Sequence, residues 1–403
     1  MNPLSSIEAA LLERAAAAPM LAQVQDWAAI NSGSRHLDGL ARMASALADS
    51  FAVLPGDLTL IDAVPVETMR ADGRVETIIH GQHLHLSVRP QAPVQILLTG
   101  HMDTVFAADH PFQAQRWIEP GVLNGPGVAD MKGGIAVMLS ALQAIEGTEA
   151  AQMLGYDVVI NSDEEVGSPS SAGLLRTVAA GKVAAFTYEP ALPDGTLAGA
   201  RAGSGNFSIV VTGRSAHAGR NPDEGRNALL AAADLALRLK AGSGPGCSCN
   251  PAKIEGGGPN NVVPDHAVLR VNFRPRTPQD EAAARALIER AMTAVARDHD
   301  VSLHLHGGFG RPPKPMDDKA ERLFGLVKQC GADLGLEIGW RDTGGVCDGN
   351  NIAACGVPVV DTMGVRGGSI HSDAEFLIAD SLPERAQLSA LALLRIAQGK
   401  YKI

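Results

Sequence analysis

The chain has 403 residues, of which 45% are hydrophobic and 19% charged, so it is long enough to bury a large core and to form two domains. Its formal net charge is −10 and it contains no Lys/Arg-rich run, which argues against a nucleic-acid partner and favours a small-molecule partner. The sequence has no run of about 18 uninterrupted apolar residues, so we expect no membrane partner.

The N-terminal residues and the cysteines together predict a cytoplasmic protein. Glu8, Glu13 and Arg14 interrupt the apolar stretch that a secretion signal would need. The five cysteines, an odd number, lack the paired CxxC spacing of a structural zinc site. We therefore expect reduced thiols and a cytoplasmic location.

Four short apolar runs predict a mostly parallel sheet. They cover residues 95–100, 156–161, 183–188 and 357–362, and longer helical patterns alternate with such runs up to about residue 200. Strands that helices cover on both faces have near-continuous apolar sequences of this kind. The predicted fold class is therefore α/β.

The stretch from 207 to 306 has a different rhythm, with two helical patterns among strand-like runs, and it predicts a small α+β layer of ferredoxin-like order. The earlier strand style resumes afterwards, at 357–362. We therefore predict a discontinuous catalytic domain, 1–201 and 312–403, with an inserted domain at 202–311. The Gly/Pro/Ser-rich segment 241–251 is predicted to be a lid loop.

Residues suited to metal binding follow the predicted strands. Carboxyl ends of parallel strands meet at one edge of a sheet, where ligands of such folds bind. Imidazole and carboxylate ligands together suit zinc, and three protein ligands per ion leave room for a catalytic water. An aspartate two residues after a histidine can orient the imidazole. The residues are His101, Asp103, Asp130, Glu164, Glu165, Glu189 and His371.

Two other interpretations of these residues remain open at this point. A calcium site that only stabilises the protein would use oxygen ligands, which His101 and His371 fit poorly. A binding module that has kept the fold without turnover is opposed by Glu164, because one of the adjacent carboxylates Glu164 and Glu165 can bind metal while its neighbour works. Five further histidines lie in strand-like alternation, which predicts a solvent face, and we exclude them as ligands: His80, His83, His85, His304 and His306.

Eight motifs identify a family resemblance over nearly the whole chain. In order they are GHMDTV, GPGVADMKGG, NSDEEVGS, YEP, GRSAHAG, NNVVPD, GGVCDGNN and GSIHSD. The chain resembles the aminoacylase and carboxypeptidase G family of two-zinc peptidases, and its glutamate carboxypeptidase branch most of all. The resemblance implies a catalytic domain of zinc-peptidase type and an insert that serves as a lid and dimerisation domain, hence a homodimer.

The resemblance also implies roles for the residues at the sheet edge. Two zinc ions per chain are implied, with cobalt or manganese as possible substitutes. Glu164 is implied as the general base that takes a proton from water. Asp103 supports the ligand His101. The implied ligands are His101 and Glu189 for one ion and Glu165 and His371 for the other, with Asp130 bridging both.

Residues outside the metal set are implied to bind the substrate. His217 of the insert would reach across the dimer and stabilise the oxyanion. Arg311 and Asn261 resemble the family's clamp for a free substrate carboxylate. Gly344 and Gly345 resemble a glycine pair that lets the backbone approach the substrate.

Two departures from the family pattern bear on specificity. The glutamate branch has a lysine near the position of Thr196, so a preference for glutamate is not implied, although Arg201 could compensate. Cys347 stands where many members have serine or threonine.

The expected reaction is hydrolysis of an amide bond to a C-terminal or N-acylated amino acid, and N-acyl-amino-acid deacylase or desuccinylase activity is the alternative.

Overall fold

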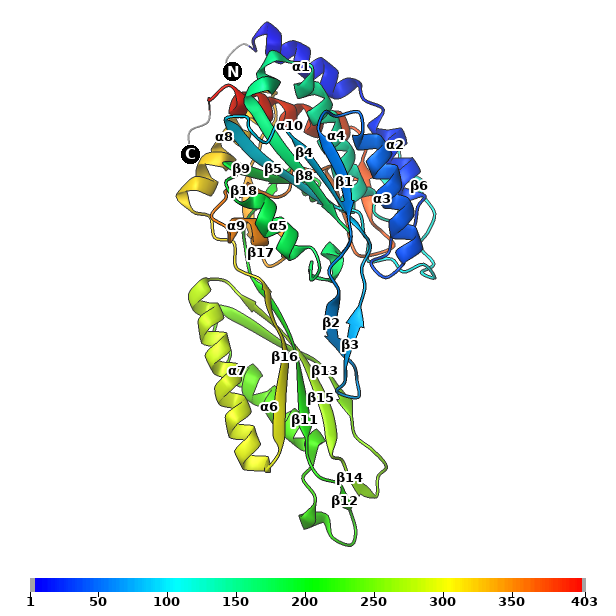
Figure 1. The fold of residues 1–403 in the computed structure, drawn as a ribbon, viewed down its shortest axis with the longest axis vertical. Coiled ribbons are helices and arrows are strands. Elements are labelled where there is room, and N and C mark those ends of the chain that lie inside the picture. The colour runs from blue at the N-terminus through cyan, green and yellow to red at the C-terminus, as the bar shows by residue number, and fades with distance from the viewer. Residues whose placement is uncertain (1–3, 401–403) are drawn as a thin grey trace.

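The computed structural model describes residues 4–400. The molecule is elongated, with an upper body built on a six-stranded sheet and a lower body built on a four-stranded sheet (Figure 1). The hydrophobic core of the lower body consists only of residues between 207 and 309, and the cores of the upper body contain none of them. Each body therefore has a large core of its own, and one small cluster joins the two, in which Met69 of the upper body packs against Val210 and Val268 of the lower body.

The upper sheet has the strand order β1-β4-β8-β5-β9-β18. Strands β8, β5, β9 and β18 run parallel to one another, and β1 and β4 are antiparallel at one edge. This confirms the predicted α/β class and the four predicted strands. The bounds are β1 Asp57–Ile61, β4 His83–Val88, β5 Val94–His101, β8 Leu154–Asn161, β9 Ala184–Thr187 and β18 Val359–Val360.

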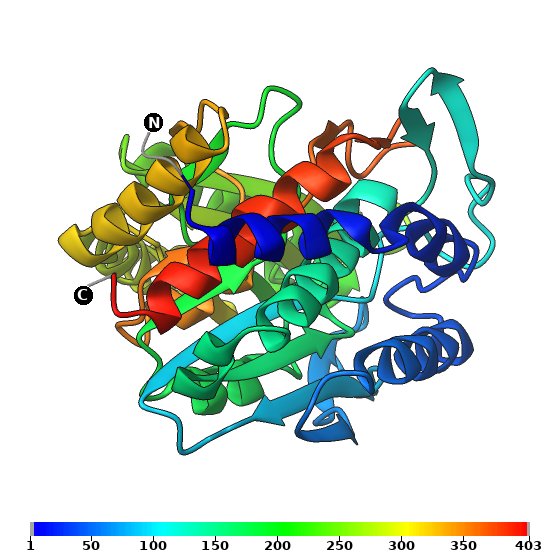
Figure 2. The same ribbon diagram turned by 90° about the horizontal axis from the view of Figure 1, so that it is seen from above.

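Helices cover both faces of this sheet. Ile96 and Leu98 belong to the main core on one face, whereas Leu97 belongs to a second cluster with α5 and α9 on the other, as alternation along a strand requires. Helices α1, α4 and α10 pack against one another over the main core (Figure 2). The helices are α1 Ser6–Ala17, α2 Met20–Ala28, α3 Leu37–Phe51, α4 Gly134–Glu146, α5 Ala172–Ala179, α8 Asp318–Asp333, α9 Asp348–Ala353 and α10 Ser381–Ala397.

One stretch, Val128–Glu146, is long and apolar enough to cross a membrane by length and composition alone. It comprises the turn η1 (Val128–Gly133) and α4, and 94% of its most apolar window is buried inside the structure. Its apolar side chains therefore have the protein core as their environment.

The lower body, which we call the lid, has the order of a ferredoxin-like fold, as predicted. Its sheet is antiparallel with the order β13-β15-β11-β16, and its helices and strands alternate as βαββαβ. The prediction of a loop over 241–251 is wrong in its second half, because Cys247 and Cys249 pack into the lid core from an edge strand. The bounds are β11 Ser204–Thr212, α6 Ala228–Gly242, β13 Cys247–Gly256, β15 His266–Pro275, α7 Pro278–His299 and β16 Ser302–Arg311.

Two hairpin-like pairs extend from these bodies. Strands β2 (Val66–Met69) and β3 (Val75–Ile78) reach from the upper body to the lid, where Arg270 donates a 2.7 Å hydrogen bond to the backbone oxygen of Met69 (Figure 1). Strands β12 (Ala216–His217) and β14 (Val262–Val263) pair at the far tip of the lid.

The remaining elements are short. Strands β10 and β17 form a separate parallel pair, and β19, β20, β7 and β6 form a small antiparallel sheet. Single turns of irregular helix precede or follow several strands. The bounds are β6 Arg116–Glu119, β7 Val122–Asn124, β10 Leu197–Arg201, β17 Trp340–Thr343, β19 Gly367–Gly368, β20 Phe376–Ile378, η2 Glu149–Met153, η3 Glu164–Val166 and η4 Pro222–Glu224.

The excluded histidines lie outside the two groups of residues that could hold a metal ion, His101/Asp130/Glu165 and His101/Glu164/Glu189, but the prediction that all five face solvent is wrong. His80, which precedes β4, and His83, the first residue of β4, are buried, and Oγ of Ser170 lies 3.2 Å from Nε2 of His83. His85 is half-buried and lies 2.7 Å from Asp157. Ser170 covers the imidazole of His83, so the alternation of polar and apolar residues along β4 does not predict the exposure of this side chain.

Candidate metal and catalytic site

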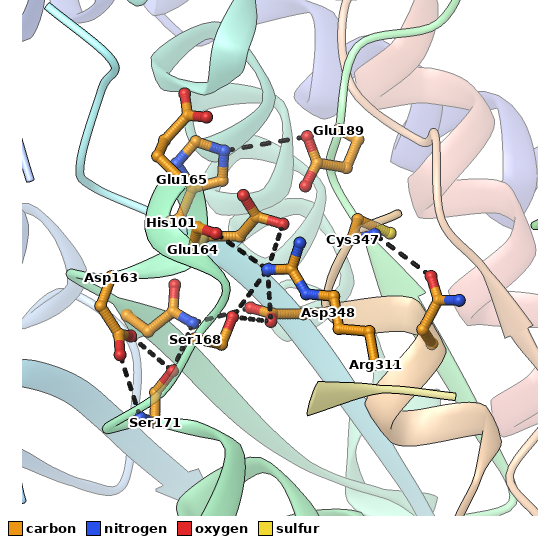
Figure 3. Close-up of polar contacts among 12 residues, drawn as sticks. His101, Asp163, Glu164, Glu165, Ser168, Ser171, Glu189, Arg311, Cys347 and Asp348 are labelled. Atoms are coloured by element: carbon orange, nitrogen blue, oxygen red, sulfur yellow. Dashed lines mark hydrogen bonds and ion pairs between the residues drawn. The ribbon is translucent and has the colours of Figure 1, made fainter. Parts of the chain in front are cut away.

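The predicted ligands converge at the carboxyl ends of three parallel strands (Figure 3). His101 is the last residue of β5, and Glu164 and Glu165 open the turn η3 that follows β8. Glu189 follows β9 by two residues. Because these strands run parallel, three segments far apart in the sequence deliver their polar side chains to one place.

Asp130 lies between the two imidazoles. Its Oδ1 is 3.0 Å from Nε2 of His101, and its Oδ2 is 3.3 Å from Nε2 of His371. Nε2 of His371 is also 3.1 Å from Oε2 of Glu165, and Nε2 of His101 is 3.8 Å from Oε2 of Glu189. Each histidine thus has one carboxylate of its own and shares Asp130 with the other.

The electrostatics of this cluster fit a pair of divalent cations. Burial, and then the charge of Asp130, raise the pKa of Glu165 to about 8, and burial also raises that of Glu189. The hydrogen bonds to Asp130 and Glu165 raise the pKa of His371 to about 11. Carboxylates crowded in this way repel one another unless protons or cations lie between them. Imidazole and carboxylate donors suit a borderline-soft divalent ion.

Glu375 holds the loop that carries Asp130. Its carboxylate accepts hydrogen bonds from the backbone N–H groups of Gly127 at 3.1 Å, Ala129 at 3.0 Å and Asp130 at 3.0 Å. Burial, and then the charge of Asp130, raise the pKa of Glu375 to about 7. None of the eight motifs includes Glu375; its position two residues beyond the motif GSIHSD, and four after His371, is the signal that was available.

Asp103 orients the imidazole of His101 and the backbone of Glu164 and Glu165. Nδ1 of His101 hydrogen-bonds the backbone oxygen of Asp103 at 2.9 Å, while Oδ1 of its carboxylate lies 3.4 Å from the same nitrogen. The carboxylate mainly accepts the backbone N–H groups of Glu164 (3.1 Å) and Glu165 (3.2 Å), and the hydroxyl of Ser34 (2.7 Å). It therefore fixes the segment on which two site residues lie.

Glu164 is buried at the bottom of this cluster. Burial raises its pKa to about 7, the positive charge of Arg311 opposes that shift, and the negative charge of Glu189 adds to it. A carboxyl group with a pKa near neutrality can both accept and donate a proton at physiological pH.

Arg311, the last residue of β16, enters the site from the lid. Its Nη2 lies 2.7 Å from Oε1 of Glu164, although without hydrogen-bond geometry, and it donates to the backbone oxygen of Glu164 and to Oγ of Ser168, both at 2.8 Å (Figure 3). Asp348 lies 3.6 Å away. The guanidinium is thus already engaged with the edge of the upper sheet.

A cavity of about 800 Å³ opens over these residues and reaches the lid. Gly344, Gly345 and Arg201 line it as predicted residues, but Arg201 donates a 2.7 Å hydrogen bond to Asp361. Two arginines that the sequence motifs did not single out also line it, Arg274 and Arg341. Arg274 shares a face of β15 with Arg270 and Asn272, so the polar alternation of that strand was an available signal.

His217 and Asn261 are not near the metal-type residues of the same chain. They lie together at the tip of the lid, where Asn261 accepts a 2.9 Å hydrogen bond from the N–H of Ala218. Nδ1 of His217 accepts the backbone N–H groups of Gly219 (3.1 Å) and Arg220 (3.2 Å). These contacts place the proton of the neutral imidazole on Nε2, which is then a donor.

Comparisons with known proteins agree on one family. The model of peptidase family M20/M25/M40 matches residues 97–395. Carboxypeptidase G2 of Pseudomonas sp. (strain RS-16) is 30% identical over 333 residues, which cover 80% of this chain and 79% of that protein. Succinyl-diaminopimelate desuccinylase of Xanthomonas oryzae pv. oryzae (strain PXO99A) is 30% identical over 315 residues, which cover 72% of this chain and 80% of that protein.

Solved structures share the fold. A dinuclear metal-binding peptidase of the M20 family from Bacillus subtilis superposes with a TM-score of 0.66 at 15% identity, and the match covers 97% of this chain and 99% of that one.

Proposed function

Because the chain belongs to peptidase family M20/M25/M40 and is a metal-dependent amide hydrolase, we propose that it releases a C-terminal or N-acylated amino acid in the manner of a glutamate carboxypeptidase. The observation that carries this proposal is the position of Asp130, which meets both His101 and His371 while the buried Glu164 lies beside them. A bridging carboxylate and an adjacent carboxyl of near-neutral pKa are the parts that water-dependent amide hydrolysis needs.

We propose zinc as the metal, with two ions per chain and with cobalt or manganese as functional substitutes. His101 and Glu189 would hold one ion, Glu165 and His371 the other, and Asp130 both. Bound divalent ions supply Lewis-acid polarisation of an amide carbonyl and lower the pKa of water. Three protein ligands per ion support this choice, because catalytic zinc sites keep an open position.

Glu164 would act as the general base and then the general acid. Its carboxylate takes the proton of the attacking water and gives it to the leaving nitrogen, which needs a pKa near the working pH. Its pKa of about 7 supports this role. Asp103 would keep Glu164 and Glu165 in place through their backbone N–H groups.

His217 would act in the site of a second subunit. Its Nε2–H is a donor of the kind that stabilises an oxyanion, but in its own chain it lies at the far tip of the lid. A homodimer through the lid would bring it, with Asn261, to the partner's pocket. The exposed edge strand β13 and the exposed side chains of Leu230 and Leu237 on α6 support the lid as that interface.

The substrate would carry a free carboxylate. Arg274 lines the pocket, forms no ion pair with any residue from 4 to 400, and hydrogen-bonds only Asn272 and the oxygen of Gly344. It is therefore better placed for that carboxylate than Arg311, which would have to exchange its contacts with Glu164. Gly344 and Gly345 would let the substrate approach the backbone.

We also propose a reducing location such as the cytoplasm, which the five free cysteines support.

N-acyl-amino-acid deacylation or desuccinylation is a second candidate. The 30% identity with a succinyl-diaminopimelate desuccinylase favours it. The two reactions use the same bond chemistry and differ in the group on the far side of the amide.

A substrate panel tests both candidates. The zinc-loaded protein would be assayed for release of amino acids from dipeptides, N-acyl-amino acids and acyl-glutamates. We expect turnover of at least one class, and its loss on chelation and in Glu164→Ala. Silence across the panel from protein that holds two zinc ions would argue for a binding module instead.

A further inference from the structure

One wall of the pocket is the parallel pair of β10 and β17. In its register Ala198 lies opposite Arg341, and Leu197 lies opposite Trp340. Thr196, Ala198, Arg341 and Thr343 all line the cavity that also contains Asp130 and Glu164. The wall therefore faces the space that a substrate bound at the metal-type residues would fill.

Four arginines line this cavity, and they differ in what already neutralises them. Arg201 is 2.7 Å from Asp361, and Arg311 is 2.7 Å from Glu164. Arg274 and Arg341 form no ion pair with any residue of the described chain, 4–400, and the side chain of Arg341 has no hydrogen bond there either. Two positive charges in the pocket are thus left for a ligand.

The acidic residues beside Arg341 form no ion pair with its guanidinium group. Asp194 accepts the backbone N–H of Thr196 at 2.9 Å, and Asp342 accepts that of Ala200 at 3.0 Å. Neither carboxylate forms an ion pair with Arg341 within 4 Å, although, after the hydrogen bond from Thr196, the charge of Arg341 is one of the smaller causes that lower the pKa of the exposed Asp194. Both are occupied in shaping the ends of the same wall.

We propose that Arg341 binds the side-chain carboxylate of the substrate and so makes the enzyme selective for an acidic amino acid. The inference rests on the proposed function. Arg274 would take the α-carboxylate while Arg341, on the neighbouring wall, takes the second one. A guanidinium suits this task because its planar fork pairs with both oxygens of a carboxylate.

The neutral residues of the wall make the role of Arg341 specific. Thr196, Ala198 and Thr343 carry no charge, and Asp342, the acidic residue of β17 that also lines the cavity, already accepts the N–H of Ala200 at 3.0 Å. An acidic side chain that lies against this wall therefore has Arg341 as the cation that forms no ion pair within residues 4–400. Arg341 is exposed in the free protein, so its contribution grows only as the substrate displaces water from the wall.

The test uses substrates that differ in charge and hardly in shape: benzoyl-glutamate and benzoyl-glutamine, with Ala-Glu and Ala-Gln as a second pair. We expect the zinc-loaded protein to have at least about 10-fold higher kcat/KM for the glutamate member, since hydrogen bonds to charged groups are worth roughly this much. Arg341→Gln should remove most of that ratio and change kcat/KM for the glutamine member by less than about 3-fold. Arg42→Gln, at an exposed arginine of α3 outside the pocket, is the control.

Two outcomes separate the proposals from each other. Turnover of both members with the same ratio in wild type and Arg341→Gln would overturn the role of Arg341 and leave the proposed hydrolysis standing. If no member is turned over, calorimetry with free L-glutamate and L-glutamine on the zinc-loaded protein still decides the question. A preference for glutamate that Arg341→Gln abolishes would support the anion site although the reaction fails, and equal binding would overturn it.

Discussion

Oε1 of Glu164 lies 2.7 Å from Nη2 of Arg311, so the last residue of the lid's final strand touches the proposed general base. The same nitrogen donates to the backbone oxygen of Glu164. The position of the lid and the proton affinity of the base are therefore coupled through one guanidinium. Any movement of β16 relative to the upper sheet would change the charge that Glu164 experiences.

This contact predicts the pH dependence of an Arg311 variant. The charge of Arg311 opposes the effect of burial on the pKa of Glu164, so its removal in Arg311→Met should raise that pKa. A higher pKa leaves less of the carboxylate at a given pH, so the acid limb of the kcat/KM profile should move upward by about one pH unit. Arg311→Lys keeps the charge and should restore much of the original profile; an unmoved limb in Arg311→Met, with an unchanged Tm, would contradict the coupling.

A second prediction separates catalysis from metal binding at Glu164. Glu164→Gln keeps the shape of the side chain but can no longer accept the proton, so kcat should fall by about 10² to 10⁴. Zinc content, measured by elemental analysis after dialysis, should stay at two ions per chain. Glu165→Gln is the matched comparison, because the proposed ligand set predicts that it loses metal as well as activity.

Much of the fold could be predicted from the sequence because its strongest signals are local. The buried parallel strands have continuous apolar runs, and both the order of the lid elements and the polar residues after β5, β8 and β9 are visible along the chain. The loop predicted at 241–251 failed because an edge strand with alternate cysteines needs no apolar run.

The parts of the site that were missed depend on contacts between distant segments. Arg341 joins the pocket only because β17 pairs with β10 across more than a hundred residues, and Glu375 matters only because its carboxylate reaches the loop of Asp130. His83 was predicted to face solvent, but the segment before α5 covers it through Ser170. No periodicity in the sequence reports such pairings.

The proposed dimer gives a third prediction, on mixed subunits. His217→Ala and Glu164→Ala should each be inactive alone. If His217 acts in the partner's site, a heterodimer of the two variants has one site with both wild-type residues. Mixing and reassembling equal amounts should then restore roughly a quarter of wild-type activity, because about half the dimers are mixed and each has one intact site of two.

The control for this experiment is another exposed histidine of the lid. His304→Ala should be active alone and should gain nothing from mixing beyond its own share of activity. Absence of any recovery in the mixture of His217→Ala and Glu164→Ala, with dimers present by light scattering, would place His217 outside the partner's site.

Metal binding should release protons, which is the fourth prediction. In the metal-free cluster the pKa of Glu165 is about 8 and that of His371 about 11, so both groups hold a proton at pH 7. A metal ion binds only the deprotonated carboxylate and the neutral imidazole. Titration of the chelated protein with zinc at pH 7, in buffers of different ionisation enthalpy, should show release of more than one proton per chain. Zinc binding with no dependence on buffer would contradict the proposed ligands.

The last prediction concerns stability below the pocket, where Asp361 lies 2.7 Å from Arg201 and 3.2 Å from Lys314. Burial alone would raise the pKa of Asp361, but these two cations outweigh it and hold the pKa below its ordinary value of 3.8. A lowered pKa means that the charged form stabilises the fold fully above about pH 4, and that this contribution is lost as the pH falls through the folded value.

Asp361→Asn leaves two buried cations without a counter-charge, so it should lower the free energy of unfolding by about 3 to 5 kcal/mol at pH 7. Urea titrations should show the difference from wild type constant between about pH 5 and 8 and shrinking below 3.8. Asp300→Asn, which breaks an exposed pair with Arg226, should change stability by less than about 1 kcal/mol and so control for the loss of any aspartate.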